Sequence, residues 1–430
     1  MKLAELRGIL QYVLQFREKT FVLALDGAVV ADDNFATLLL DVALLRSVNI
    51  RVVLVHGAGQ QIQALAAARG VTASDLDGAG VTDAATLDLS IAASTRLTHE
   101  VLEGLTANDL RGACANVITA YPLGILQGVD HQLTGKVERV DVDLVQSLLS
   151  QGVVPVIPPL GIDGEGRTYR LNSDRVAVAV AEQVKAIKLI FVTVQDGLVH
   201  RGELIRQMLP DQLQELIRDA PDGFAPGLLS KAVHAASAGQ AGVPRVHVIN
   251  GARDEGLLGE VFSNHGLGTL IHVNEYEQIR PARKKDVRAI LMLTRQAVEA
   301  DELVRRTAAT IERDLADYFI FEVDRNPVAC VALHVYPETR RGELACLYVS
   351  TAHEDRGIGR KLIQFVEKRA RELGLDDLVV LSTQAFSYFQ SKGGFVEGTP
   401  DDLPAVRRER YEQSGRRSKV LIKRLGARVG

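Results

Sequence analysis

The stretch Glu343–Ile363, ELACLYVSTAHEDRGIGRKLI, decides the fold of the C-terminal part of this chain. It begins with an apolar run, Leu344–Val349, which is typical of a buried strand, and passes into the glycine loop Arg356-Gly357-Ile358-Gly359. A helix is expected to open directly after the loop. This order leaves backbone N–H groups unpaired at the positive end of a helix dipole, and it therefore predicts a phosphate or pyrophosphate site. A purely structural turn is the alternative, because many strand–helix turns need glycine.

The composition is that of an ordinary globular protein. The 430 residues are enough for two or three domains, 47% are hydrophobic and 24% are charged. The net charge of −4 gives no reason to expect a nucleic-acid or membrane partner. Three scattered cysteines predict no disulfide framework, and the histidines show no spacing for a metal site. Because neither a signal peptide nor a membrane span is visible, we expect a cytoplasmic protein.

Hydrophobic patterning divides the chain into an N-terminal helix at 1–18, a domain at 19–273, a linker at 274–280 and a domain at 281–430. Strand-like and helix-like runs alternate in the first domain, which predicts a parallel sheet covered on both faces by helices. The second domain starts with helices, one of them long over LVRRTAATIERDL at 303–315. The expected strands are Phe21–Leu25, Arg51–Val55, Val153–Ile157, Ile187–Val194, Arg245–Ile249, Tyr318–Glu322 and Ala329–His334, and the expected helices include Phe35–Ser47 and Thr86–Thr106.

The second domain resembles the GNAT N-acetyltransferases. After the glycine loop comes the aromatic-rich segment Tyr388–Phe395, YFQSKGGF, in the order of that family's acetyl-CoA site. The resemblance implies acetyl-CoA as cosubstrate, with the pyrophosphate cradled by the loop and the pantetheine arm held along the motif strand. Glu354 stands where the family has Gln or Arg, and an acid there is unfavourable beside a pyrophosphate. The implied acetyl-CoA contacts are Leu347, Val349, Arg356, Gly357, Gly359 and Arg360.

Four patches of the second domain together resemble the bacterial N-acetylglutamate synthases, which carry out the first step of arginine biosynthesis. They are LVRR at 303–306, GELACLYV at 342–349, LST at 381–383 and RRSKVL at 416–421, in the family's order. The resemblance implies transfer of acetyl from acetyl-CoA to the amine of L-glutamate by direct attack. It also implies a homo-oligomer, usually a hexamer.

The same resemblance implies roles for individual residues. Glu343 would be the general base, and Ser382 or Tyr388 would give a proton to the departing thiolate. Arg306 and Arg416 would hold the two carboxylates of glutamate, since a guanidinium matches a carboxylate bidentately. Cys346 would line the substrate pocket. The alternatives are structural: strand-end polarity for Glu343 and Ser382, surface charge for the arginines, and core packing for Cys346 and Tyr388.

The first domain resembles the amino acid kinase family, with altered phosphate loops. Active members end the first strand in Lys-x-Gly-Gly, whereas this chain has Ala24-Leu25-Asp26-Gly27. Their second loop, His-Gly-Gly-Gly-Pro, is here His56-Gly57-Ala58-Gly59-Gln60. Asn172-Ser173-Asp174 and Lys231 still match the family. Because Asp26 would repel phosphate, we expect no phosphoryl transfer.

The segment Val246–Ile271 resembles the arginine-sensing segment of arginine-inhibited members of that family. The resemblance implies L-arginine as a feedback effector. An acidic partner and an aromatic face suit a guanidinium. The implied effector contacts are Tyr12, His247, Glu260, Gly266 and Gly268.

Three alternatives stay open. The enzyme could acetylate another amino acid or amine, which would not need two arginines. The first domain could retain N-acetylglutamate kinase activity, against which Asp26 argues. Both domains could be binding modules of a non-catalytic arginine sensor.

Overall fold

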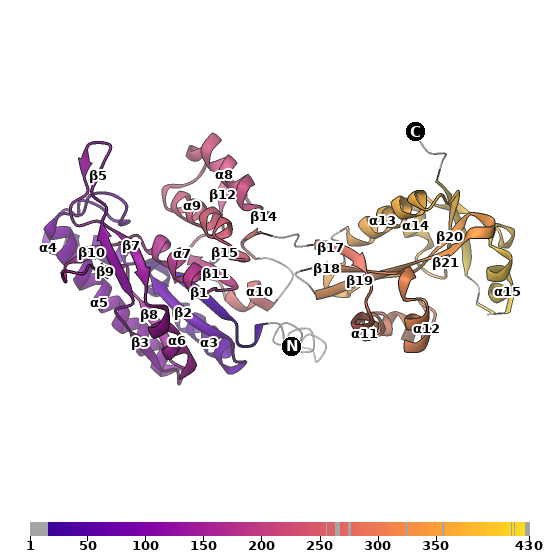
Figure 1. Ribbon diagram of the computed structural model, residues 1–430, viewed down its shortest axis with the longest axis horizontal. Coiled ribbons are helices and arrows are strands. Elements are labelled where there is room, and N and C mark those ends of the chain that lie inside the picture. The colour runs from indigo at the N-terminus through magenta and orange to yellow at the C-terminus, as the bar shows by residue number, and fades with distance from the viewer. Residues whose placement is uncertain are drawn as a thin grey trace. The chain divides into compact units, whose positions relative to one another are not determined.

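The computed structural model describes residues 16–254, 256–262, 267–273, 277–323, 326–354, 357–413, 415–416 and 418–425. They form two compact units, Met1–Asn274 and Glu275–Gly430, and each unit is described by itself (Figure 1). The helix predicted at 1–18 lies almost wholly outside the described residues. Among the helices that the structure describes, none combines the length and hydrophobicity needed to span a bilayer.

The first unit is built on an eight-stranded sheet with the order β14-β16-β15-β11-β1-β2-β8-β3. Its pairs are parallel except β15 with β16, which confirms the predicted parallel sheet. The central strands read TFVLAL and KLIFVT and are buried along their whole length, as expected for strands covered on both faces. The strands are β1 (Thr20–Leu25), β2 (Arg51–His56), β3 (Gly112–Cys114), β8 (Val154–Ile157), β11 (Lys188–Thr193), β14 (Gln207–Met208), β15 (Arg245–Asn250) and β16 (Thr269–His272).

Alternate residues of β1 enter two hydrophobic clusters, one on each face of this sheet. Val22 and Ala24 pack in a cluster with α6, α7 and α9, whereas Leu23 and Leu25 pack in a cluster with α3, α5 and α10. The helix predicted at Phe35–Ser47 is α3, and the one predicted at Thr86–Thr106 lies within α5. The helices are α2 (Gly27–Val30), α3 (Phe35–Ser47), α4 (Gly59–Arg69), α5 (Ala84–Ala107), α6 (Val142–Ser150), α7 (Ser173–Gln183), α8 (Pro210–Asp219), α9 (Pro226–Gln240) and α10 (Gly256–Phe262).

Smaller strands complete the first unit. A four-stranded sheet has the order β10-β9-β4-β7, and β5 with β6 and β12 with β13 form two separate two-stranded sheets. The bounds are β4 (Ile118–Pro122), β5 (Ile125–Leu126), β6 (Val129–Asp130), β7 (Gly135–Val140), β9 (Leu160–Ile162), β10 (Thr168–Arg170), β12 (Val199–His200) and β13 (Glu203–Leu204).

The second unit has a seven-stranded sheet with the order β17-β18-β19-β20-β21-β23-β22. All its pairs are antiparallel except β20 with β21. Figure 1 shows α13 and α14 on one face of this sheet and α11 and α12 on the other. The elements are β17 (Glu277–Pro281), α11 (Val287–Glu299), α12 (Ala308–Arg313), β18 (Tyr318–Val323), β19 (Asn326–Tyr336), β20 (Arg341–Val349), α13 (Ile358–Glu372), β21 (Asp377–Ser382), α14 (Phe386–Gly393), β22 (Val396–Glu397), α15 (Ala405–Gln413) and β23 (Lys419–Arg424).

Two expectations about the start of this unit are wrong. The linker predicted at 274–280 overlaps β17, whose residues from Glu277 onward pair with β18. The long helix predicted at 303–315 is a short helix, α12, preceded by an irregular segment. The reason is local: the Thr307 hydroxyl accepts the backbone N–H of Thr310 and caps a helix that begins at Ala308.

Candidate active site

β20 carries a β-bulge at Cys346. Across the β19–β20 pair, Cys330 lies opposite Tyr348 and Ala332 lies opposite Ala345, so β20 has one residue more than β19 between these pairs. Cys346 has a φ of 52°, a left-handed conformation that is uncommon without glycine. A bulge takes its residue out of the regular ladder, so it can aim main-chain groups at a ligand.

The bulge also changes which face each side chain takes. Leu344 and Leu347 pack in the cluster beneath α13, whereas Ala345 and Cys346, two consecutive residues, pack in the cluster beneath α11. A regular strand would alternate. The bulge therefore places Cys346 on the face of α11 and returns Leu347 and Val349 to the face of α13.

The ladder between β20 and β21 stops early. It runs from Arg341↔Asp377 to Glu343↔Val379, although β20 continues to Val349 and β21 to Ser382. Beyond Glu343 the main chain of β20 has no register partner on β21. An extended ligand arm can hydrogen-bond to these unpaired main-chain groups in the way that an added strand does. The predicted pantetheine contacts, Leu347 and Val349, lie along this opening.

The glycine loop begins α13 with a left-handed residue, as the sequence suggests. Gly357 has a φ of 73° and caps the helix. Gly359 lies so close to Tyr388 that an added Cβ would meet its hydroxyl at 2.5 Å. Arg356, a predicted pyrophosphate contact, lies outside the described residues.

Tyr388 is not a core residue, because 37% of it is exposed. Partial burial raises the pKa of its hydroxyl, and the backbone N–H of Arg360 opposes that rise by donating to the oxygen. The hydroxyl therefore lies at the first turn of α13, among the predicted pyrophosphate contacts. The core-packing alternative for Tyr388 is wrong.

Glu343 and Ser382 lie on opposite faces of the sheet, at the point where β20 and β21 separate. Glu343 shares the face of its register partner Val379. Ser382 lies two residues after Val380 on β21, and the Val380 side chain packs beneath α13. Because side chains alternate along a strand, Ser382 lies on that same face. Both residues are buried. If an amine and a thioester entered the opening from opposite faces, the amine could lie near Glu343 and the thioester near Ser382.

Arg306 and Arg416 line one cavity of about 860 Å³. Arg416 Nη2 donates to the main-chain oxygen of Asp301 at 2.5 Å and to its Oδ1 at 2.9 Å. Burial alone would lower the pKa of Arg306, but Cys346, Tyr318 and Glu343 outweigh burial and raise it. A hydrogen bond with Cys330 and the charge of Arg306 in turn lower the pKa of the Cys346 thiol. The fold thus brings together four predicted residues: Arg306, Arg416, Cys346 and Glu343.

Arg407 and Tyr336 are site neighbours that the motifs did not reveal. Arg407 Nε donates to Glu343 Oε2 at 2.8 Å, and the Tyr336 hydroxyl donates to the same oxygen at 3.1 Å. The only signal in the sequence is the run of basic residues near the C-terminus, to which Arg407 belongs.

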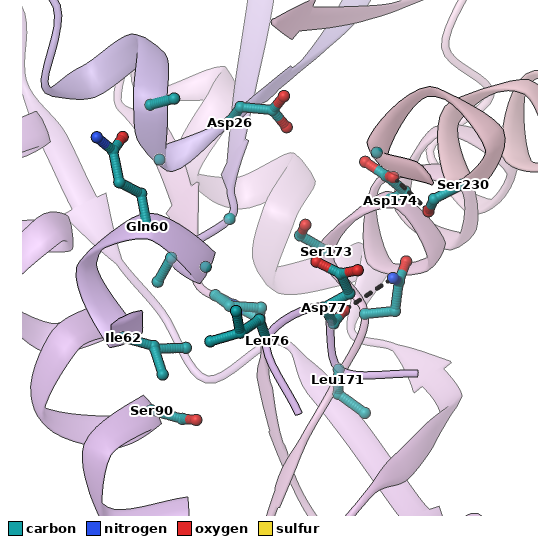
Figure 2. A pocket seen from close by; sticks show the side chains of 18 of the residues that line it. Asp26, Gln60, Ile62, Leu76, Asp77, Ser90, Leu171, Ser173, Asp174 and Ser230 are labelled. Carbon is teal, nitrogen blue, oxygen red and sulfur yellow. Dashed lines mark hydrogen bonds between the residues drawn. The ribbon is translucent and has the colours of Figure 1, made fainter. Parts of the chain in front are cut away.

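A second cavity, of about 220 Å³, lies in the first unit where the loops after β1 and β2 meet the starts of α4, α7 and α9. Lys231 Nζ contacts Asp26 Oδ1 at 2.7 Å and Asp174 Oδ1 at 3.2 Å. Figure 2 shows Ser230 beside Asp174, to which it donates a hydrogen bond of 2.7 Å, and Asp26 at the end of its strand. The lysine that matches the kinase family is therefore held by two carboxylates.

The charges of this cavity leave little attraction for a phosphate. Burial raises the pKa of Asp26, despite the opposing charge of Lys231. Burial would lower the pKa of Lys231, but Asp174 and Asp26 outweigh burial and raise it. Asp26 thus supplies, from within the chain, a negative group at the end of the first strand. This arrangement agrees with the expectation that no phosphoryl transfer takes place here.

The predicted effector residues of the first unit also meet. His247 Nδ1 lies 2.7 Å from Glu260 Oε1, and Glu260 Oε2 accepts the backbone N–H groups of Leu267 at 2.6 Å and Gly268 at 3.1 Å. An added Cβ on Gly268 would lie 2.1 Å from the oxygen of Val248, so only glycine fits. Burial would raise the pKa of Glu260, but His247 and the two N–H groups lower it to about 2. Tyr12 and Gly266 lie outside the described residues.

Known proteins resemble this chain over nearly its whole length. Residues 19–250 match the amino acid kinase family and residues 284–395 match the acetyltransferase (GNAT) family. The amino-acid acetyltransferase of Pseudomonas putida (strain GB-1) is 35% identical over 430 residues, which cover 98% of each chain. The chain belongs to the amino-acid acetyltransferase family.

Two solved structures agree with this membership. N-acetylglutamate synthase from Neisseria gonorrhoeae complexed with coenzyme A and L-arginine is 30% identical with a TM-score of 0.83. The same enzyme complexed with coenzyme A and N-acetyl-glutamate is 32% identical with a TM-score of 0.62. Each match covers 99% of this chain and 100% of the other. The predictions of a kinase-like domain followed by a GNAT domain, of an N-acetyltransferase and of acetyl-CoA as cosubstrate are confirmed.

The described part of this acetyltransferase holds no group of three or more His, Cys, Asp or Glu residues that could bind a metal ion. The two clusters on the sheet of the kinase-like domain draw mainly on strand and helix residues. Ala24, Leu25 and Ala58 of the altered segments also pack in these clusters, so their apolar side chains contribute to the core.

The cavity at Asp26 generates a stability prediction. Replacing Lys231 by Met leaves the buried Asp174 and the half-buried Asp26 without their counter-ion and should cost roughly 3–5 kcal/mol. Asp26→Asn should be neutral or slightly stabilising, because the raised pKa of Asp26 means that its ionised form opposes folding at neutral pH. Denaturant unfolding followed by circular dichroism, with hydrogen exchange to locate the transition, measures both. Lys136→Met, at an exposed position, is the control. Equal effects of the two lysine replacements would contradict the buried ion pair.

The Glu260 contacts generate a pH prediction. The pKa of Glu260 in the folded chain, about 2, lies below its ordinary value of 4.5. The stabilisation is therefore complete above pH 4.5 and is lost as the pH falls toward 2. Glu260→Gln should lower the free energy of unfolding at pH 7 by roughly 3 kcal/mol, and this deficit should stay constant down to about pH 5 and shrink as the pH falls further toward 2. Glu203→Gln, at an exposed position, is the matched control. A deficit that does not change with pH would refute the assignment.

Proposed function

We propose that this enzyme transfers the acetyl group of acetyl-CoA to the amine of L-glutamate, giving N-acetyl-L-glutamate in the first step of arginine biosynthesis. The observation that carries the proposal is the pair Arg306 and Arg416 in one cavity, with Glu343 acting electrostatically on Arg306. A dicarboxylate needs two cationic partners, and its amine needs a base nearby. The N. gonorrhoeae enzyme whose name states this product shares the fold over the whole chain.

In the proposed reaction, residues on the two faces of the opening between β20 and β21 carry out different steps. Acetyl-CoA supplies the activated acetyl group. Glu343 takes the proton of the amine from the α11 face, through its Oε1 oxygen or a water molecule. Main-chain N–H groups at the Cys346 bulge polarise the acetyl carbonyl. Ser382, on the α13 face, donates a hydrogen bond to the departing sulfur. Tyr388 lies on α14, and its hydroxyl contacts the first turn of α13 rather than the reacting atoms.

L-Arginine is proposed as the feedback effector of the kinase-like domain. The N. gonorrhoeae enzyme was crystallised with L-arginine. Here, Glu260 offers a buried carboxylate beside His247, at the end of the segment that resembles an arginine sensor. A cationic ligand would replace part of the network around Glu260 and so bias the order of the segment that follows it.

A phosphoryl-transfer function for the kinase-like domain has little support. Lys231 is paired with Asp26 and Asp174, and a carboxylate lies where active family members have glycine. A further acetyl acceptor with one carboxylate or none is also less favoured, because it would leave Arg306 or Arg416 without a role in binding.

The reaction itself is the first test. Purified protein with acetyl-CoA and L-glutamate should release free CoA, detected with a thiol reagent, and L-aspartate or a monoamine should support it far less well. L-Arginine should reduce the rate, and Glu260→Gln should abolish that response while leaving the uninhibited rate intact. No release of CoA with glutamate would refute the proposed reaction. A rate that arginine does not change would refute only the regulation.

The two arginines generate a sharper prediction. Arg306→Ala and Arg416→Ala should each raise KM for glutamate by about 30-fold to 100-fold, the worth of a lost charge-assisted hydrogen-bond pair. KM for acetyl-CoA should stay within about twofold, because neither residue lies among the predicted acetyl-CoA contacts. Arg313→Ala, on the exposed side of α12, is the matched control and should change neither constant. Equal effects on both substrates would argue against a dicarboxylate pocket.

A further inference from the structure

We propose that Arg407 and Tyr336 are positioning residues that fix Glu343 as the base, by holding one of its carboxylate oxygens and leaving the other to the substrate. The inference rests on the proposed function, since it takes Glu343 to be the group that accepts the proton of the amine.

The contacts of Glu343 are one-sided. Arg407 Nε donates to Oε2 at 2.8 Å and the Tyr336 hydroxyl donates to the same Oε2 at 3.1 Å. In the part of the chain that the structure describes, no donor contacts Oε1. Glu343 is only 5% exposed, so both hydrogen bonds lie in a poorly hydrated environment where charge-assisted bonds are strong. A base fixed through one oxygen presents the other in a defined direction, which proton transfer requires.

Arg407 is itself fastened to the strand that carries Glu343. It lies in the first turn of α15, which two residues separate from a 3₁₀ turn at Pro400–Asp402. Arg341, two residues before Glu343 on β20, donates from Nη1 to the main-chain oxygen of Asp402 at 2.7 Å. The Arg407 guanidinium is thus linked to Glu343 directly, and its part of the chain is linked to β20 a second time through the hydrogen bond between Arg341 and Asp402.

The chain that leads into α15 is also held by packing. Leu403 is buried in a cluster with Val379, the register partner of Glu343, and with Val420 of β23. The start of α15 therefore packs on the same part of the sheet from which Glu343 projects. This second anchor limits the movement of Arg407 relative to the base.

Tyr336 approaches Glu343 from the neighbouring strand. On β19, His334 lies opposite Glu343 and Tyr336 lies opposite Arg341, so Tyr336 reaches Glu343 diagonally on the same face. Burial, with the Glu343 carboxylate as its neighbour, raises the pKa of Tyr336. Its hydroxyl therefore keeps its proton and acts as a donor throughout the working pH range.

The next arginine of the same helix has a different environment and offers a matched control. Arg408 pairs with Asp401, whose side chain is 85% exposed, and its Nε donates to the main-chain oxygen of Pro400. Arg407 and Arg408 therefore share helix, residue type and charge, but only Arg407 contacts Glu343.

The test compares single and double variants with glutamate and acetyl-CoA. Arg407→Ala should lower kcat by about 10-fold to 100-fold, with both KM values within about threefold. Tyr336→Phe should lower kcat by about 3-fold to 10-fold, and Arg408→Ala should stay within about twofold of the parent. Free guanidinium should restore part of the activity of Arg407→Ala. In the Glu343→Ala background, Arg407→Ala should cause no further loss, because a residue that acts through another has no effect once that partner is gone.

The outcomes separate this inference from the proposed function. An unchanged kcat for Arg407→Ala, or an equal loss with and without Glu343, overturns the positioning role, as does a rise in KM for glutamate alone. If Glu343→Ala retains full activity, the base assignment itself fails. If the parent releases no CoA with glutamate, the proposed reaction fails. Should Arg407→Ala not fold, Arg407→Lys and Tyr336→Phe, checked for acetyl-CoA binding, carry the test.

Discussion

The second unit depends on one interruption in a ladder of hydrogen bonds. β20 and β21 pair as far as Glu343↔Val379 and then continue without pairing, while a bulge at Cys346 shifts the faces of the residues that follow. If β20 and β21 stayed paired, their main-chain groups would bond to one another and would not be free to bind a ligand. The sheet would then have no opening that is accessible from both faces. The interruption costs ladder hydrogen bonds, and the unit retains its stability from the cluster beneath α13 and the cluster beneath α11. The glycine start of α13, the buried Ser382 and the buried Glu343 are arranged around this point.

The first unit matches the amino acid kinase family, but its phosphate loops differ from the pattern of active members. Asp26 contacts Lys231, and position 24, where active members are expected to have lysine, is alanine. A buried charge must be paired or neutralised, and here the pairing is internal rather than with a phosphate. Among the described residues, His247 and the backbone N–H of Gly268 likewise contact the Glu260 carboxylate. A cationic effector that binds this carboxylate would therefore compete with these contacts.

Much of the fold could be predicted, and the failures have local causes. Buried parallel strands such as β1 and β11 are continuous apolar runs, and α3 is a clearly bounded run of mainly apolar residues. The hydrophobic pattern of the sequence therefore predicts all three elements. The segment 303–315 also has helical residues, yet a threonine cap at Thr307 restricts the helix to its second half. β17 is short and polar at its start, so its sequence pattern predicts a linker. For Tyr388 the sequence leaves core packing open, because an aromatic residue gives no sign of whether its hydroxyl has a partner.

The order of the elements, the glycine loop of α13, the alanine at position 24 and the predicted site residues follow from the sequence alone, because these features are local or belong to motifs. Which of these residues meet depends on the tertiary fold. Arg306 and Arg416 reach one cavity from distant parts of the chain, and Arg407 holds Glu343 although 64 residues separate them. Such contacts depend on strand register, on the bulge at Cys346 and on the packing of α15 against the sheet, and none of these leaves a periodic signal in the sequence.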